Sequence, residues 1–283
     1  MLAHLIAPIR VMLAVAGACL LMACGSDRPT NALEAIRQRG KVIVATEAAL
    51  EPFEFVREGR IVGYNKEILD YVVAGLGVPV EQLNLPFQGI LPGLIAHKFD
   101  FVATSVAISE ERAKRYAYTR PIGSFDQAVV VRAGDERIKT MDDLNGRVIA
   151  TQLASSAQPV LEALERQLQA RGGSGFAELK LFTAYPETFV ALDSAQVDAI
   201  VVASTSAAVL MKKMPGEYAL AARLGDEAYL AWVTRPQDLE LRDFINTRID
   251  ELRANGKLKE LQLKWFGFEM NTPTTGYLPA GAF

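Results

Sequence analysis

The sequence predicts an α/β fold arranged in two lobes, and three features of its pattern indicate this. Compact β-branched runs at residues 41–46 and 146–151 are typical of strands buried on both faces. Helical and extended segments alternate after each run, which favours a mostly parallel sheet flanked by helices. Half of the 283 residues are hydrophobic, so the chain can supply the core of two ordinary domains or one large one.

The first αβ series lies before residue 123. A helix ends at Gly40, and a second, amphipathic helix buries Ile68 and Leu69 and stops before Pro79. In order we expect a helix at 32–39, a strand at 41–46, a turn at 51–55, a hairpin at 56–62, a helix at 64–75, a strand at 80–85, a helix at 88–97, a strand at 99–104 and a helix at 109–115.

The second series follows a connector at residues 119–123. Its longest helix ends at Gly172, and the tail of the chain contains an amphipathic helix that aligns Leu241, Ile245 and Ile249. In order we expect a strand at 127–132, a helical turn at 140–145, a strand at 146–151, a helix at 155–170, a strand at 178–182, a helix at 186–193, a strand at 197–202, and helices at 204–213, 237–255 and 258–265.

Residues 1–23 have the pattern of an export signal. Arg10 is their only charged residue, and the apolar run that follows it is too short to span a bilayer. The segment LMACGS at 21–26 resembles the lipobox of bacterial lipoproteins, which implies that Cys24 is lipidated and that residues 24–31 are a linker. The alternative is a simple secretory signal in which Cys24 is incidental. Both interpretations predict an exported protein, and the first predicts a periplasmic one anchored to a membrane.

Charge and residue counts exclude several classes of function. Loss of residues 1–23 would remove one positive charge and no acid, changing the formal net charge from -3 to -4, and no basic cluster is present, so we expect no nucleic-acid partner. The only cysteines are Cys19 and Cys24, and the only histidines are His4 and His97. A thiol nucleophile, a Ser-His-Asp triad, a histidine-rich metal site and a bound cofactor are therefore not expected.

Ligands of open α/β sheets bind beyond the carboxyl ends of the strands, so the residues that follow each strand are candidates. Ser155 and Ser156 also open a helix, whose free N–H groups would suit an anion, although simple N-capping explains both serines equally well. The other candidates of this kind are Glu47, Phe87, Thr104, Ser105 and Ser204.

Arg112 is a candidate for a different reason. If Ser109 is the N-cap of its helix, Glu110 and Glu111 suit the helix dipole, whereas Arg112 opposes it by about 0.3 to 1 kcal/mol. A residue that breaks a local rule indicates a possible functional site. The alternative is a surface arginine that pairs with Glu110 or Glu111.

An ordered set of motifs resembles the bacterial extracellular solute-binding proteins of family 3, which deliver polar amino acids and related compounds to ABC importers. The resemblance covers about residues 32–268. The matching pieces are GKVIVAT at 40–46, PFEF at 52–55, GY at 63–64, LGV at 76–78, GILPGL at 89–94, KFD at 98–100, AISEER at 107–112, DLNGRV at 143–148 and QVDA at 196–199.

The resemblance implies a type II periplasmic-binding-protein fold without a cofactor, in a protein expected to be a monomer that meets a membrane permease. Lobe 1 would comprise residues 32–123 and 228–283, and lobe 2 residues 124–227, joined by two hinge strands. It also implies that Arg112 binds the carboxylate of the ligand with help from backbone groups at Ser156, that Phe87 packs on the ligand, and that Thr104 and Ser105 form hydrogen bonds with it.

Departures from the family pattern concern the ammonium group of an amino-acid ligand. Ala203 stands where an acid usually pairs with it, and Ala107 where a hydroxyl residue is usual. Leu50 replaces a common aromatic residue, and residues 65–66 depart from the usual acidic-apolar pair. We therefore expect either an amino acid whose cation meets Glu47, or a derivative with a modified or missing amine. The alternatives are an enzyme that resembles cyclohexadienyl dehydratases, with Glu47 as general acid, and the ligand-binding part of a sensor, which the lack of an apolar span before the end at Phe283 disfavours.

Overall fold

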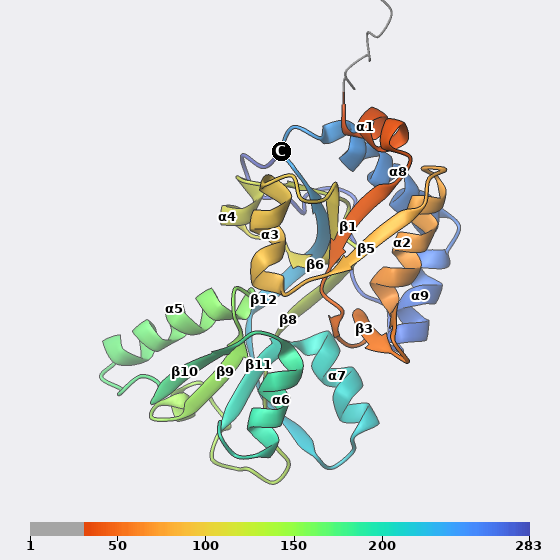
Figure 1. Cartoon of the computed structure of the whole chain (residues 1–283). Helices are drawn as coiled ribbons and strands as arrows, with labels where there is room; N and C mark the ends of the chain where they lie inside the picture. The colour runs from red at the N-terminus through yellow and green to blue at the C-terminus, as the bar shows by residue number, and fades with distance from the viewer. Residues whose placement is uncertain (1–30) are drawn as a thin grey trace, which may run out of the picture.

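One long mixed β-sheet runs through the protein. The structure, a computed structural model, describes residues 31–283 (Figure 1), so the predicted signal and Cys24 lie outside the described residues. Along the sheet the strand order is β10-β9-β11-β8-β12-β6-β1-β5, and β7 pairs with β12. The strands are β1 (Val42–Thr46), β5 (Val80–Asn84), β6 (Phe101–Ala107), β7 (Ala117–Tyr118), β8 (Gly123–Arg132), β9 (Val148–Gln152), β10 (Glu178–Phe182), β11 (Ala199–Ala203) and β12 (Tyr218–Thr234).

Two groups of three parallel strands form the two ends of this sheet. They are β5-β1-β6, which we call the first half, and β10-β9-β11, which we call the second half. Between them, β8 is antiparallel to β11, β12 is antiparallel to β6, and β8 and β12 are antiparallel to each other. The predicted mixed, mostly parallel α/β sheet is confirmed.

The helices occur where the sequence predicts them, with ends that differ by a few residues. They are α1 (Ala32–Arg39), α2 (Tyr64–Ala74), α3 (Phe87–Ile95), α4 (Glu110–Ala113), the 3₁₀ helix η1 (Asp142–Leu144), α5 (Ala157–Ala170), α6 (Tyr185–Asp193), α7 (Ser204–Lys213), α8 (Leu239–Ala254) and α9 (Lys257–Trp265). Within residues 31–283, none of them combines the length and apolar composition that crossing a membrane requires.

A small second sheet lies beside the first half. It consists of β2 (Ala49–Leu50), β3 (Glu54–Arg57) and β4 (Arg60–Val62), and the β3–β4 turn places Glu58 and Gly59 at positive φ. This confirms the predicted hairpin around those two residues. The chain then passes Gly63, whose φ is +127°, and a Cβ atom there would lie 2.4 Å from the carbonyl oxygen of Phe53. Glycine is required at this close approach.

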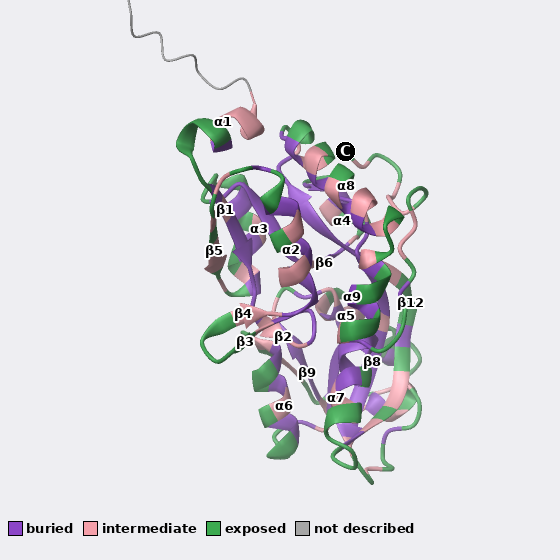
Figure 2. Ribbon diagram, turned by 90° about the vertical axis from the view of Figure 1, so that its right-hand side faces the viewer, coloured by how far each residue is buried: buried purple, intermediate pink, exposed green. Residues whose placement is uncertain are grey.

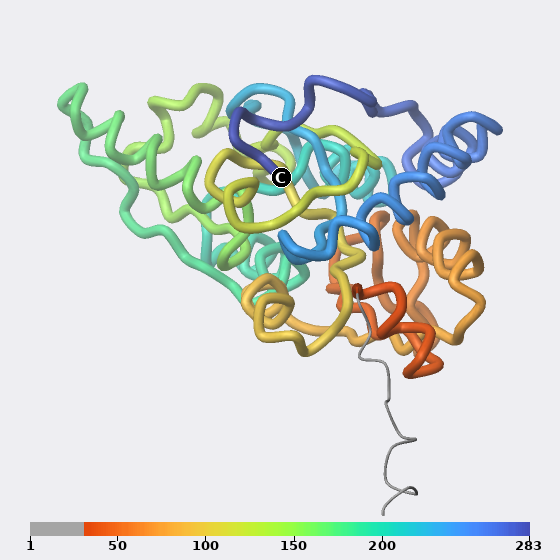
Figure 3. The backbone as a smooth tube through the Cα atoms, turned by 90° about the horizontal axis from the view of Figure 1, so that it is seen from above, coloured from red at the N-terminus to blue at the C-terminus, as the bar shows by residue number. Residues whose placement is uncertain are grey.

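Both halves bury their strands under helices on two faces (Figure 2). In the first half, Ile68 of α2 shares one hydrophobic cluster with Ile245 of α8 and Leu258 of α9, while Leu94 of α3 belongs to the cluster on the other face. Figure 3 shows α8 and α9, from the end of the chain, beside α2. In the second half, α5 packs on one face and α6 with α7 on the other.

The longest strand, β12, was not predicted. Its sequence begins with Tyr218-Ala219-Leu220-Ala221-Ala222 and contains Gly225, and alanine and glycine are depleted in strands. Its pairing is also irregular, with register shifts between Leu220 and Ala222 and between Leu224 and Ala228. The strand is specified by its ladder with β8, which is remote in the sequence, rather than by local propensity.

Candidate functional site

The candidate residues lie where the carboxyl ends of the two strand groups meet. Glu47 follows β1, Phe87 begins α3 after β5, and Ser155 and Ser156 lie between β9 and α5. Thr104 and Ser105 differ from the prediction, because β6 does not end before them but continues to Ala107.

Seven of the eight predicted residues line one inner cavity of about 40 Å³. Ser204 is the exception: it lines a separate cavity of about 290 Å³, and its hydroxyl accepts a hydrogen bond from the backbone of Asp126 at 3.4 Å. The seven are Glu47, Phe87, Thr104, Ser105, Arg112, Ser155 and Ser156. The inner cavity has room for only a few water molecules.

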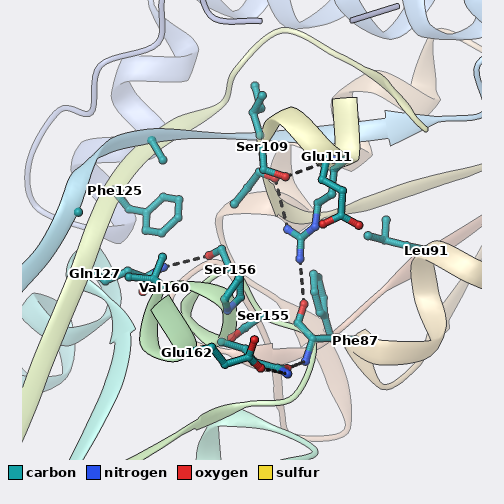
Figure 4. Close-up of a pocket in the computed structure, with 18 of the residues that line it drawn as sticks. Phe87, Leu91, Ser109, Glu111, Phe125, Gln127, Ser155, Ser156, Val160 and Glu162 are labelled. Atoms are coloured by element: carbon teal, nitrogen blue, oxygen red, sulfur yellow. Dashed lines mark hydrogen bonds between the residues drawn. The ribbon is translucent and has the colours of Figure 1, made fainter. Parts of the chain in front are cut away.

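A larger chamber of about 580 Å³ adjoins the inner cavity (Figure 4). Phe87, Arg112, Gln127, Ser155 and Ser156 line both spaces, so the two adjoin at these residues. The chamber has the size of an ordinary small-molecule site.

Arg112 lies at the junction of the two spaces and reaches both halves. Its Nη1 donates to the carbonyl of Ala107 at 3.3 Å, its Nη2 donates to the carbonyl of Ala154 at 2.8 Å, and its Cζ lies 5.7 Å from the ring centre of Phe87. The hydroxyl of Ser109 accepts from the Arg112 backbone at 3.3 Å, which confirms the predicted N-cap.

The dipole argument for Arg112 is weaker than predicted, because α4 is a single turn with little dipole. The surface-pair alternative, a bond to Glu110 or Glu111, is not favoured either, since the guanidinium donates to the carbonyls of Ala107 and Ala154 and Glu110 pairs with Lys114 at 2.8 Å.

Ser156 also departs from its alternative role. It occupies the N-cap position of α5 but makes no side-chain capping bond, and its hydroxyl instead accepts from Gln127 Nε2 at 3.0 Å. Ser155 lies within 3.4 Å of the hydroxyl of Thr151. Neither serine is explained by simple capping.

Glu47 is a buried carboxyl that faces the second half. Its side chain accepts from Gln152 Nε2, and the same amide nitrogen donates to the carbonyl of Thr183 at 3.0 Å. Burial raises the pKa of Glu47 to about 7, although the hydrogen bonds from Gln152 and from the Phe87 backbone lower it. Because Gln152 belongs to β9, this contact joins the two halves, as the Arg112–Ala154 contact does.

Glu54 is a second carboxyl in the inner cavity, and sequence reasoning missed it. Asn65 Nδ2 and the hydroxyl of Thr104 donate to its two oxygens. Burial raises the pKa of Glu54 well above its usual value, the bond from Asn65 lowers it, and the nearby charge of Glu47 raises it further. The sequence signal that could have identified Glu54 is its position between Phe53 and Phe55 in an extended segment.

Asn65 explains one departure from the family pattern, because it serves the buried Glu54. Besides bonding Glu54, its amide donates to Ser105 Oγ at 2.8 Å and accepts from Trp232 Nε1 at 3.4 Å. An acid at residue 65 would place a second carboxyl against Glu54, whereas the amide satisfies it.

Three other polar residues of the inner cavity were also missed: Gln127 of β8, Gln152 at the end of β9, and Tyr185 at the start of α6. Gln152 and Tyr185 lie at carboxyl ends of strands, so the rule that found Glu47 could have found them. Within residues 31–283, no group of three or more His, Cys, Asp or Glu side chains could hold a metal ion.

The chain is similar to proteins of known families. A model of the bacterial extracellular solute-binding proteins, family 3, matches residues 42–268. The L-cystine-binding protein TcyJ of Escherichia coli (strain K12) is 27% identical over 240 residues, which cover 84% of this chain and 87% of that protein.

Two solved structures are similar as well. An ancestral arginine-binding protein bound to arginine is 31% identical, with a TM-score of 0.73 and coverage of 81% of this chain and 99% of the other. The ancestral amino acid-binding protein AncCDT-1, a precursor of cyclohexadienyl dehydratase, is 26% identical, with a TM-score of 0.74 and coverage of 83% and 99%.

Proposed function

Because the chain belongs to the bacterial extracellular solute-binding proteins of family 3, we propose that it captures a polar amino acid or a related small carboxylate and delivers it to an ABC permease. The observation that carries this proposal is the position of Arg112, whose guanidinium lies between the two cavities and beside Phe87. A planar guanidinium suits a carboxylate, which it binds through two parallel hydrogen bonds.

The ligand carboxylate would bind the guanidinium of Arg112, which now donates to the carbonyls of Ala107 and Ala154. Glu47, Phe87, Thr104, Ser105, Ser155 and Ser156 would line the remainder of the ligand site, while Ser204, which lies in another cavity, is left out of the proposal. The names of the relatives, which include cystine-binding and arginine-binding proteins, support an amino-acid ligand.

Delivery would depend on opening and closing of two lobes, residues 32–123 with 228–283 and residues 124–227, connected through β8 and β12. The contacts Arg112–Ala154 and Glu47–Gln152 cross between the halves, as does the ion pair of Lys213 with Glu51. Opening of the lobes would break these contacts. A ligand that adds contacts to both lobes shifts the population toward closure, which the permease would recognise.

The test is a binding screen on the purified protein. Amino acids, opines, betaines and plain carboxylates are compared by thermal shift, and the best ligand is then titrated by calorimetry. Arg112→Ala should weaken its binding by about 100-fold or more, since it leaves a buried carboxylate without its partner. The matched control is Arg115→Ala, which removes a guanidinium that lines only the outer chamber and should change affinity by less than about threefold. Unchanged affinity in Arg112→Ala would contradict the carboxylate assignment.

An enzymatic role is the second candidate, because Glu47 has a pKa of about 7 and one similar structure is a precursor of cyclohexadienyl dehydratase. A carboxyl that holds its proton near neutral pH can act as a general acid. We propose binding without turnover. The test is incubation with prephenate or arogenate, followed by detection of phenylpyruvate or phenylalanine. Product formation that Glu47→Gln abolishes would overturn the proposal of binding without turnover.

We also propose that the protein is an exported, lipid-anchored monomer. The segment LMACGS before the folded body supports lipidation of Cys24 after removal of residues 1–23. Mass spectrometry of the membrane fraction should find a diacylated N-terminal cysteine. Cys24→Ser should abolish the diacylated species, and a mature wild-type N-terminus without lipid would contradict the anchor.

A further inference from the structure

We propose that the side-chain amide of Gln127 selects for a ligand that carries an α-amino group, by accepting a hydrogen bond from it. This inference rests on the proposed function, in which the ligand carboxylate lies at Arg112. It assigns recognition of the amine to Gln127. On the neighbouring strand β11, Ala203 stands where the family usually has an acid for this role.

The first observation is a buried acceptor without a partner. Gln127 is 5% exposed, and its Nε2 donates to Ser156 Oγ at 3.0 Å. Its Oε1 is buried and accepts no hydrogen bond from residues 31–283. Buried polar atoms of folded proteins almost always have a partner, so a free acceptor on a cavity wall indicates a donor that arrives with a ligand.

The second observation is the direction that the sheet gives to this side chain. Gln127 of β8 pairs directly with Ala203 of β11 in an antiparallel ladder, so the two side chains lie on the same face, roughly 5 Å apart. Both residues line the inner cavity, and the small side chain of Ala203 leaves the space beside it to the longer amide. Figure 4 shows Gln127 reaching Ser156 at the edge of the outer chamber.

The third observation is that both carboxyls of the inner cavity already accept hydrogen bonds from the protein. Asn65 and Thr104 bond the carboxyl oxygens of Glu54, while Gln152 and the Phe87 backbone bond the carboxyl of Glu47. The remaining buried side-chain oxygens without a partner in the described chain belong to Gln88, Thr205 and Ser206, and none of these residues lines the inner cavity.

The arrangement suits the two groups on the α-carbon of an amino acid. The carboxylate requires donors, which Arg112 supplies, and the ammonium requires an acceptor, which Gln127 Oε1 supplies in the same cavity. The carboxyls of Glu47 and Glu54 line that cavity as well. An amide in place of a direct carboxylate partner makes recognition of the amine depend on hydrogen bonding more than on charge.

The experiment compares ligands that differ only in the amine. Calorimetry measures L-arginine against 5-guanidinopentanoate, and L-glutamine against 4-carbamoylbutanoate, on wild-type protein, Gln127→Leu and Gln127→Glu. We expect Gln127→Leu to weaken binding of the amino acid that binds wild type by about tenfold or more, and binding of its deaminated counterpart by less than about threefold. Gln127→Glu should retain or tighten the amino acid and weaken the deaminated acid.

Each other outcome has a defined meaning. Equal losses for both members of a pair in Gln127→Leu would overturn the inference, because Gln127 would then contact a part that both ligands share. Wild-type protein that binds the deaminated acid but not the amino acid would also overturn it and leave the carboxylate assignment intact. Binding of none of the four probes would contradict both the inference and an amino-acid ligand of this kind. Melting temperatures without ligand verify that both variants are folded, and Gln127→Glu carries the test if Gln127→Leu is not.

Discussion

Replacement of Glu47 by glutamine should flatten the dependence of stability on pH. Burial raises the pKa of Glu47 from 4.5 to about 7, so between these values the folded protein holds a proton that the unfolded chain has released. Raising the pH through this window removes the proton, and the corresponding stabilisation, about 3 kcal/mol, is lost. Glu47→Gln keeps an oxygen that can accept from Gln152 but cannot titrate.

Urea unfolding at a series of pH values between about 5 and 8 measures this difference, provided that the dependence on denaturant stays the same in both proteins. The wild-type protein should lose about 2.5 kcal/mol more than Glu47→Gln between pH 5 and pH 8, while Glu54 contributes its own pH dependence to both. Glu81→Gln is the control, because Glu81 is a half-exposed carboxyl paired with Lys41 at the surface. Parallel pH profiles for wild type and Glu47→Gln would refute the reasoning.

Two further predictions concern stability. Gly63→Ala should lower the free energy of unfolding in urea by about 3 kcal/mol or more, because the new Cβ would clash with the Phe53 carbonyl and φ is positive there. Gly59→Ala, which places its Cβ in open space, should lower it by about 1 kcal/mol, and equal losses would contradict the proposed clash. Arg235→Ala should lower the free energy of unfolding by about 3 to 5 kcal/mol, because the carboxyl of Asp238, which lies 2.5 Å from Arg235 Nε, would lose its buried partner. A loss below about 1 kcal/mol would show that water replaces the guanidinium.

The fold was largely predictable because the parallel strands and their helices carry strong local patterns. The runs at residues 41–46 and 146–151 became β1 and β9, and the amphipathic face of α8 is buried as its spacing predicts. The missing element, β12, has an alanine-rich start and two register shifts, so its identity as a strand comes from pairing with β8. Pairing between segments so far apart in the chain leaves little trace in a local window.

The site was predictable at the residues that follow strand ends and at Arg112, whose charge is unusual for its place in a helix, but not at other residues. Seven residues predicted on those grounds or from the family resemblance meet in one cavity, but Ser204 does not, because α7 directs it toward Asp126. Glu54 and Gln127 were missed since their roles depend on burial and on which neighbours satisfy them. Such roles depend on three-dimensional contacts that the sequence alone does not show.

The placement of α8 and α9 has a consequence for biosynthesis. The chain begins the first half, builds the whole β9-β10-β11 group, and only then returns with the two helices that cover α2. During synthesis from the N-terminus, the second half can therefore complete its core while Ile68 and its neighbours on α2 still lack their partners. Chaperones and proteases would meet the first half in that interval, and a chain truncated before α8 would expose the apolar face of α2 permanently.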